Sequence, residues 1–429
     1  MLSIRTLLCC SVVSVVTACS GSGNSIRPST SSEQSPTNDT DNVASEIAAP
    51  VTDSVTTEVT APDSVLVNQL NLDTGFYKQH LDVNGMAIVA SDRVSPYALL
   101  ESRWVIGNML VNRPDLLPVI ASTNTRLTVM AIDEFTTDVP EHSDLTPANF
   151  RDRRARGLGA TSQRPVVSAG EENVLQLPGD PYSTESILIH EFAHVVHQQG
   201  MNTLDNNFQS TLDSYYRLAI DEGLWQGTYA ATNSSEYFAE GVQSWFGTNR
   251  ENDNEHNEIN TREELVAYDL RLAGLLEQVF GDNPWQYEGP RDRQTEREHL
   301  EGFDVRAAGE FVWPDRLANI DVSDGPRGDP DVRRLPNLLE EDWSNIVSPS
   351  SPSGASTIYF YNDTASFVNV RWIDFDGQRV DYSNLLLAPD TYSSSSSFEG
   401  HLFEAVTADE GVVVAQFRVE AQTGIATID

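Results

Sequence analysis

The chain has 429 residues, with 27 basic and 64 acidic side chains and a formal net charge of -37. This balance argues against nucleic acid as a partner and against a polybasic contact with lipid, because both interactions need clustered positive charge. The length exceeds what one small core needs, so two domains plus non-globular segments are expected.

Residues 1–19 are predicted to be a bacterial lipoprotein signal peptide. Arg5 precedes an apolar run that ends in Val16-Thr17-Ala18-Cys19, and cleavage there would leave Cys19 as the acylated first residue. An ordinary secretory signal cut nearby is the alternative, since the run is too short to span a bilayer. The three cysteines all lie at or before position 19, so the mature part would hold no disulfide. We expect a protein of the bacterial cell envelope, on the outer membrane or cell surface, that contacts the membrane only through its lipid.

Residues 20–65 are rich in Ser, Thr, Asn, Asp and Pro, which predicts a disordered tether. Residues 66–345 then show the mixed pattern of an α+β domain. Strands are predicted at 86–90, 126–132 and 173–177, and helices at 95–111 and 114–121.

The stretch 183–200 is predicted to be a buried helix, with Ser183 or Thr184 at its start and Gly200 at its end. His190 and His194 are four residues apart, so they share a helix face and can bind one metal ion. Glu191, next to His190, can then act on a water at that ion. This HExxH pattern is typical of zinc hydrolases.

Further helices are predicted at 204–222, 234–246 and 262–280, with a loop at 249–260. Residues 283–345 are rich in Pro, Gly and charge and are expected to wrap the first domain. Residues 346–356 are interpreted as a linker, and 357–429 as a second domain of strands.

Two histidines leave zinc short of a third protein ligand. The HExxHxxGxxH solution is excluded, because His197 and Gly200 occupy the positions of its glycine and third histidine. Glu236 and Glu240 lie four apart on one predicted helix, where one carboxylate can bind the metal and the other can orient a ligand histidine. A pair of surface glutamates is the alternative, and His197 is expected to be a core or supporting residue.

These motifs resemble the catalytic domain of anthrax lethal factor and related gluzincin peptidases. The resemblance covers HEFAH at 190–194 and the later run from Tyr229 through Glu236 to Glu240. It implies a zincin-like α+β fold in which His190, His194 and Glu236 bind Zn²⁺. It also implies that Glu191 is the base, Glu240 supports a ligand and Tyr229 stabilises the transition state of peptide hydrolysis.

Residues 357–419 alternate apolar and polar side chains, with turn signals that predict an antiparallel sandwich. They resemble the β domain of the von Hippel-Lindau family in the segments YNDT, WIDFDG and SFEGHLF. The resemblance implies a pocket for a hydroxyproline ring. Its matching positions are Trp372, Tyr382, Ser397, His401 and Phe403, where Phe403 replaces a tryptophan. A core role for these aromatic residues is the alternative.

The sequence therefore predicts a secreted, lipid-anchored zinc endopeptidase whose C-terminal domain binds proline- or hydroxyproline-containing peptides. The competing hypothesis is a surface binding protein or adhesin with an inactive peptidase fold. The intact Glu191 favours the enzyme. An aminopeptidase is a weaker alternative, because no GxMEN-like motif is present to hold a free amino terminus.

Overall fold

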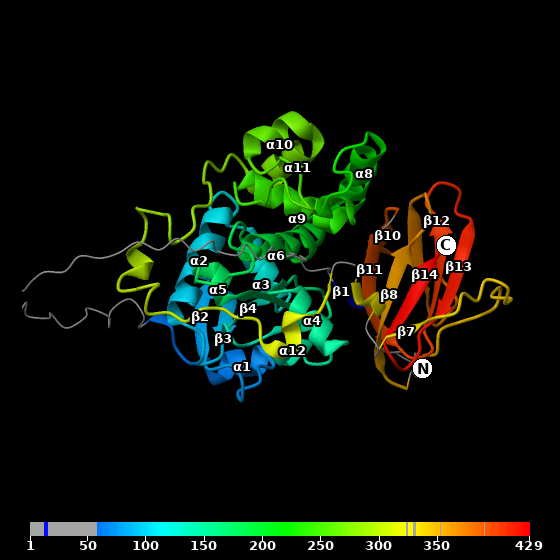
Figure 1. The fold of residues 1–429 in the computed structure, drawn as a ribbon, viewed down its shortest axis with the longest axis horizontal. Coiled ribbons are helices and arrows are strands. Elements are labelled where there is room, and N and C mark those ends of the chain that lie inside the picture. The colour runs from blue at the N-terminus through cyan, green and yellow to red at the C-terminus, as the bar shows by residue number, and fades with distance from the viewer. Residues whose placement is uncertain (1–12, 16–57, 323–324, 329–331, 352, 390) are drawn as a thin grey trace, which may run out of the picture.

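The computed structural model describes residues 13–15, 58–322, 325–328, 332–351, 353–389 and 391–429. Helices and strands mix in an α+β arrangement up to about residue 320, and two mainly antiparallel sheets follow (Figure 1). This confirms the coarse fold class. Cys19 and the predicted tether up to residue 57 lie outside the described residues. No helix within the described ranges is long and apolar enough to cross a membrane.

A five-stranded sheet forms one half of the first unit. Its order is β2 (Gln79–Val83), β3 (Met86–Ala90), β4 (Arg126–Met130), β6 (Val166–Gly170) and β5 (Gly157–Leu158). The central strands β3, β4 and β6 run parallel, whereas β2 and β5 are antiparallel edges. All of β3 is buried, as its unbroken apolar run leads one to expect. The strands predicted at 86–90 and 126–132 are confirmed, the second ending at Met130.

The strand predicted at 173–177 is wrong. Residues Glu171–Val174 form helix α5, and the sheet edge beside the metal helix is made by β5 and β6 instead. Asn173 explains the difference, because its side-chain amide donates to the carbonyls of Tyr182 and Glu185 and its oxygen accepts from the N–H of Ile187. This buried polar hub sets the local backbone more strongly than the apolar alternation does.

Helices make up the rest of the first unit. They are α1 (Ser64–Leu70), α2 (Pro96–Met109), α3 (Leu116–Ser122), α4 (Ala148–Arg154), α6 (Ile187–Val195), α7 (Asn202–Leu204), α8 (Phe208–Asp221), α9 (Ser234–Trp245), α10 (Arg262–Tyr268), α11 (Leu270–Phe280) and α12 (Asp315–Ala318). The predicted helices at 95–111, 114–121 and 234–246 are confirmed to within a few residues. The single helix predicted at 262–280 is wrong, because Asp269 interrupts it and caps α11 by accepting from the N–H of Leu272.

The metal helix differs at both ends from its prediction. Ser186, not Ser183 or Thr184, caps α6 by accepting from the N–H of Ile189 at 3.3 Å. Beyond Val195 the chain continues as a π-helical turn through Gly200. Gly200 serves close packing, since a Cβ there would lie 3.1 Å from a methyl of Leu116.

Figure 1 places α6 in the middle of the first unit, with the β2–β6 sheet on one side and helices α8 to α11 on the other. Helix α9 packs directly on α6. The main apolar core runs through both halves, so it fixes the two helices that carry the HExxH motif and Glu236.

The C-terminal unit is built from two sheets. One has the order β1 (Val13–Val15), β11 (Thr391–Phe398), β8 (Ala355–Asn362), β14 (Gly424–Ile428) and β7 (Arg333–Arg334), and the other has β10 (Arg379–Leu387), β9 (Val368–Ile373), β12 (Leu402–Thr407) and β13 (Val413–Arg418). The predicted antiparallel arrangement holds except at β14, which runs parallel to β8 and β7. Ser348, in the segment interpreted as a linker, is buried and accepts from the indole N–H of Trp372 at 3.1 Å.

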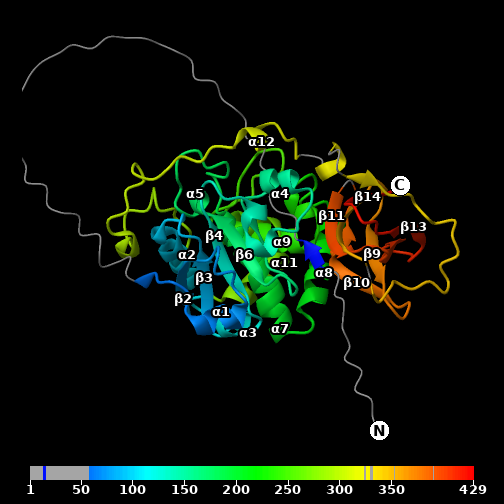
Figure 2. The ribbon, with the colours of Figure 1, turned by 90° about the horizontal axis from the view of Figure 1, so that it is seen from below.

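The two units meet along α4 and α8, which face the C-terminal sheets in both ribbon views (Figure 2). Tyr216 of α8 packs edge-on against Phe367, with ring centroids 5.9 Å apart. Arg154 at the end of α4 donates to the hydroxyl of Tyr392. The C-terminal unit therefore sits against the side of the first unit that carries α4 and α8.

Candidate metal centre

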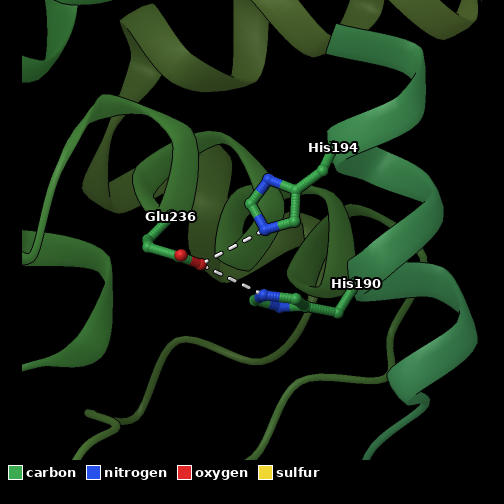
Figure 3. Close-up of side chains that lie close together, drawn as sticks. All are labelled: His190, His194 and Glu236. Atoms are coloured by element: carbon green, nitrogen blue, oxygen red, sulfur yellow. Dashed lines mark hydrogen bonds and ion pairs between the residues drawn. The ribbon is translucent and has the colours of Figure 1, made fainter. Parts of the chain in front are cut away.

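Two histidines and a glutamate converge inside the first unit. Nε2 of His190 lies 3.2 Å from Oε2 of Glu236, and Nε2 of His194 lies 3.3 Å from the same oxygen. All three side chains are fully buried. Figure 3 shows both imidazoles, from α6, pointing at the carboxylate. The structure thus brings together the three residues that the sequence predicted as ligands, and this cluster could bind a metal ion.

Local sequence explains why the three side chains meet. The four-residue spacing puts both histidines on the face of α6 that packs on α9. Asn233 caps α9 by accepting from the N–H groups of Ser235 and Glu236 at 2.9 and 3.0 Å, which fixes Glu236 in the first turn. The ligands therefore come from two helices whose relative position is set by the core.

A fourth side chain fixes the orientation of His190. Oε1 of Gln243 lies 2.7 Å from Nδ1 of His190, and the Gln243 amide donates to a carboxylate oxygen of Glu185 at 3.0 Å. Because that donation identifies the amide end of Gln243, its oxygen faces the histidine and Nδ1 carries the hydrogen. Nε2 is then the ring nitrogen left for a metal. Glu240, expected to orient a ligand, lies at 3.5 Å from the same Nδ1.

Behind Glu240 the loop at 249–260 supplies a second imidazole. Nε2 of His256 lies 3.3 Å from Oε2 of Glu240, and its Nδ1 lies 2.8 Å from Asp253. Burial lowers the pKa of His256, but the charge and hydrogen bond of Glu240, helped by the charge of Glu185, outweigh it and raise the pKa to about 9. A charged His256 therefore compensates the buried Glu240.

Gln243 and His256 are site residues that sequence reasoning missed. Gln243 follows Glu236 and Glu240 at the spacing i, i+4, i+7, so one helix face carries all three, and this pattern could have revealed it. His256 lies in an irregular acidic loop, where no periodic signal points back to the site.

Glu191 lies beside the cluster with only 1% of its surface exposed. Among the described residues, neither of its carboxylate oxygens accepts a hydrogen bond. Burial raises the pKa of Glu191 to about 8, although electrostatic interaction with His190 and Arg154 opposes the rise. A cation held by the neighbouring ligands would lower that pKa again.

Tyr229 lies near His190, with ring centroids 6.2 Å apart. Its backbone N–H donates to the carbonyl of Glu255 at 2.7 Å, and its ring packs with Tyr182 and Ile187. The residue is 8% exposed. It is therefore close to the cluster and fixed by the loop that also carries His256.

The electrostatics of the three clustered groups suit a cation. Burial alone would raise the pKa of Glu236, but the two histidines bring it down to about 2. Burial lowers the pKa of His194, so its imidazole is neutral near pH 7. A neutral imidazole and a carboxylate are the protonation states that a metal ion requires of its ligands.

No known protein family model matches this chain, and no curated protein matches it either. The likeness to gluzincins and to the von Hippel-Lindau β domain therefore rests on the motifs quoted above. The functional interpretation therefore depends on the arrangement of His190, His194 and Glu236.

The five predicted pocket positions of the C-terminal unit fall into two groups. Ser397 Oγ lies 3.0 Å from Nδ1 of His401, whose ring packs 5.4 Å from that of Trp372. Phe403 is fully buried in the sandwich core against Phe360, and Tyr382 packs half-buried on the same core. The structure thus joins Trp372, Ser397 and His401, while Phe403 lies in the interior.

Proposed function

We propose that the protein is a zinc-dependent endopeptidase of the cell envelope. One observation carries the proposal, namely the buried convergence of His190, His194 and Glu236 next to a glutamate whose carboxylate has no hydrogen-bond donor among the described residues. A structural role alone would leave Glu191 buried and unsatisfied at a cost of about 1–3 kcal/mol or more. In a reaction centre the same carboxylate would act as a general base.

The donor set fits zinc. Two ligand atoms bound at about 2.05 Å with a tetrahedral angle between them lie about 3.3–3.4 Å apart. The two nitrogen–oxygen distances to Glu236, 3.2 and 3.3 Å, match this separation. Both exceed the roughly 2.7–2.9 Å of a charge-assisted hydrogen bond. When bound, zinc would act as a Lewis acid that activates water and polarises a carbonyl.

The remaining chemistry falls to the chain's own side chains. Glu191 accepts the proton of the attacking water, because its buried carboxylate lies next to His190 in the chain and accepts no hydrogen bond from the described residues. Gln243 keeps His190 in the tautomer that presents Nε2. Tyr229 donates to the oxygen on which negative charge develops.

Substrate has a route to these groups. A cavity of about 610 Å³ between the two units is lined by Tyr229, Thr228 and Ala231. Tyr229, whose ring centroid lies 6.2 Å from that of His190, links this cavity to the buried cluster. A peptide that occupied it would meet the oxyanion donor first.

A cleavage-site profile on a protein mixture tests the proposal, comparing the wild type with Glu191→Gln. We expect new peptide ends with the wild type that disappear in the variant, together with about one zinc per chain in both. Identical profiles would favour the competing function, a surface binding protein with an inactive peptidase fold. Zinc-free protein after expression in zinc-rich medium would reject the metal site itself.

The lipid anchor is a separate part of the proposal. It rests on Val16-Thr17-Ala18-Cys19, because Cys19 lies outside the described residues. Cys19→Ala should move the protein from washed membranes to the soluble fraction without changing its melting temperature. Retention on membranes would mean another anchor.

A further inference from the structure

The cavity that ends at Tyr229 is built by both units. Its first wall consists of Gln226, Thr228, Tyr229, Asn254 and Glu255, and its second consists of Ala388, Pro389, Thr391 and Tyr392 of the C-terminal unit. Arg154, the last residue of α4, lies between the two walls. The C-terminal unit therefore forms part of the cavity that the proposed oxyanion donor Tyr229 lines.

Arg154 is a buried cation that lies beside an aromatic ring. The residue is 3% exposed. Its guanidinium donates to the Tyr392 hydroxyl, and the guanidinium carbon lies 5.2 Å from the centroid of the Tyr392 ring. Among the described residues, no carboxylate lies within ion-pair distance of it. Glu255, on the opposite wall, is already paired with Arg250 at 3.0 Å.

Three other buried arginines of this acidic chain, Arg126, Arg156 and Arg293, pair with carboxylates, whereas Arg151 packs over the Tyr359 ring at 5.0 Å, outside the cavity. Arg156 binds Glu172 at 2.5 Å and Arg293 binds Glu101 at 2.7 Å, and all four side chains are at most 3% exposed. A buried guanidinium normally needs such a partner, because its desolvation costs several kcal/mol. Among the described residues no carboxylate pairs with Arg154, which lines the cavity, so a carboxylate ligand bound there would supply the partner.

Arg154 is linked through Tyr182 to Tyr229, the proposed oxyanion donor. Its carbonyl accepts from the hydroxyl of Tyr182, which packs against Tyr229. Its charge also acts on Glu191 and on Tyr229. A ligand held by Arg154 would therefore lie in the cavity that Tyr229, the proposed oxyanion donor, also lines.

We infer that Arg154, supported by Tyr392, forms a carboxylate-binding subsite, and that the substrate is a peptide with a carboxylate near the bond to be cleaved. The carboxylate comes either from an Asp or Glu side chain or from a free C-terminus, since a guanidinium binds both in the same way. The subsite rests on the proposed peptidase function for its purpose. Its ligand chemistry is independent of cleavage.

Binding to the full-length Glu191→Gln protein tests the subsite without turnover. The probes are four pools of fluorescein-labelled hexapeptides, with one fixed Glu or Gln among randomised uncharged residues, each as the free acid or the C-terminal amide. Anisotropy at 0.15 M salt gives the dissociation constants, because at this ionic strength the repulsion from the net charge is screened beyond about 8 Å. We expect either the Glu pools to bind more tightly than the Gln pools, or the free acids to bind more tightly than the amides. The expected difference in dissociation constant is about 10- to 100-fold, the range of a hydrogen bond to a charged group.

The variants separate the subsite from general electrostatics. Arg154→Gln should abolish the preference, and Arg154→Lys should weaken it about tenfold, because lysine lacks the planar fork. Arg153→Gln is the matched control, since it removes the same charge from the same helix but its guanidinium lies over Trp313. The control should keep the full preference.

Equal binding of all pools, or a preference that survives Arg154→Gln, would overturn the inference. If Arg154→Gln does not fold, the inference would be overturned by an Arg154→Lys variant that still prefers carboxylate peptides as strongly as the wild type does. Failure of the peptidase proposal gives a different result, namely selective binding with no cleavage of any pool by the wild type. Cleavage of acidic and neutral pools at equal rates would leave the peptidase intact and remove the subsite.

Discussion

The side-chain oxygen of Gln243 lies 2.7 Å from Nδ1 of His190, and this contact determines which ring nitrogen faces Glu236. Gln243→Leu keeps the volume of the side chain but removes the acceptor. We expect zinc affinity to fall about 10- to 100-fold, as for other residues that orient a ligand histidine. Competition with a chelator of known affinity measures the change.

Gln209→Leu is the matched control for Gln243. It breaks the same kind of contact, 2.8 Å between Oε1 of Gln209 and Nε2 of His197, at a histidine that is not in the cluster. Its zinc affinity should equal that of the wild type. Equal losses in both variants would mean that general destabilisation, not ligand orientation, explains the effect.

Tyr229→Phe tests the proposed oxyanion donor. The ring packs with Tyr182 and Ile187, so phenylalanine preserves the packing and removes only the hydroxyl. We expect kcat to fall by about two to three powers of ten, with KM and zinc content little changed. Steady-state kinetics on a peptide from the cleavage profile measures this, and an unchanged kcat would assign Tyr229 a packing role.

The C-terminal cluster gives a prediction about ligand selection. Burial lowers the pKa of His401 to about 4, so its imidazole is neutral at pH 7, and among the described residues its Nε2 has no partner. If Ser397 and His401 recognise a ring hydroxyl, hydroxyproline peptides should bind more tightly than proline peptides by a factor of ten or more. Calorimetric titration of the full chain compares the two.

His401→Leu should remove the preference for hydroxyproline while leaving the sandwich folded. Tyr382 is the partly exposed member of the predicted pocket, so we expect the ring to enter past it. Equal binding of both peptides by the wild type, or none, would make this cluster a structural part of the sandwich.

His142 gives the protein a predicted loss of stability in acid. It is 2% exposed, and among the described residues neither ring nitrogen makes a hydrogen bond. Burial, with the charge of Arg164, lowers its pKa from 6.5 to about 3. The unfolded state then binds more protons than the folded state between these values, so the stabilisation is present above pH 6.5 and is lost as the pH falls.

The slope from His142 is at most about 1.4 kcal/mol per pH unit. Denaturant unfolding of metal-free protein at pH 7, 6 and 5 measures it, and His142→Leu should flatten the decline by a large part of that amount. Parallel stability curves for the two proteins would show that His142 titrates normally.

Much of the site could be predicted from sequence because its signals are local. His190, Glu191, His194 and Glu236 follow helical spacing, and the core that fixes both helices is a run of apolar residues. The missed features depend on contacts between distant segments. Asn173 organises a loop through four side-chain hydrogen bonds, and a helical turn forms where a strand was predicted.

Glycines of the edge strand are a further feature that the sequence does not reveal. Gly159, just after β5, packs on the metal helix so closely that a Cβ would lie 2.8 Å from Cβ of His194 and 3.1 Å from its Cδ2. Real Cβ atoms do not approach a neighbour to 2.8 Å, so either the strand or the helix must move. The neighbouring Gly157 stands in the same relation to Glu191, at 2.8 Å from its Cγ.

Gly159→Ala should therefore displace His194 and weaken zinc binding. The expected loss is about tenfold or more in affinity, with overpacking costing about 1–3 kcal/mol of stability. Gly274→Ala, in the middle of α11, is the matched control, because nothing lies within 4 Å of its added Cβ. Alanine there should stabilise the protein by about 0.5–1 kcal/mol and leave zinc affinity unchanged. Chelator competition and thermal unfolding on both variants decide the matter, since equal zinc affinity in the two would mean that β5 does not hold the metal helix in place.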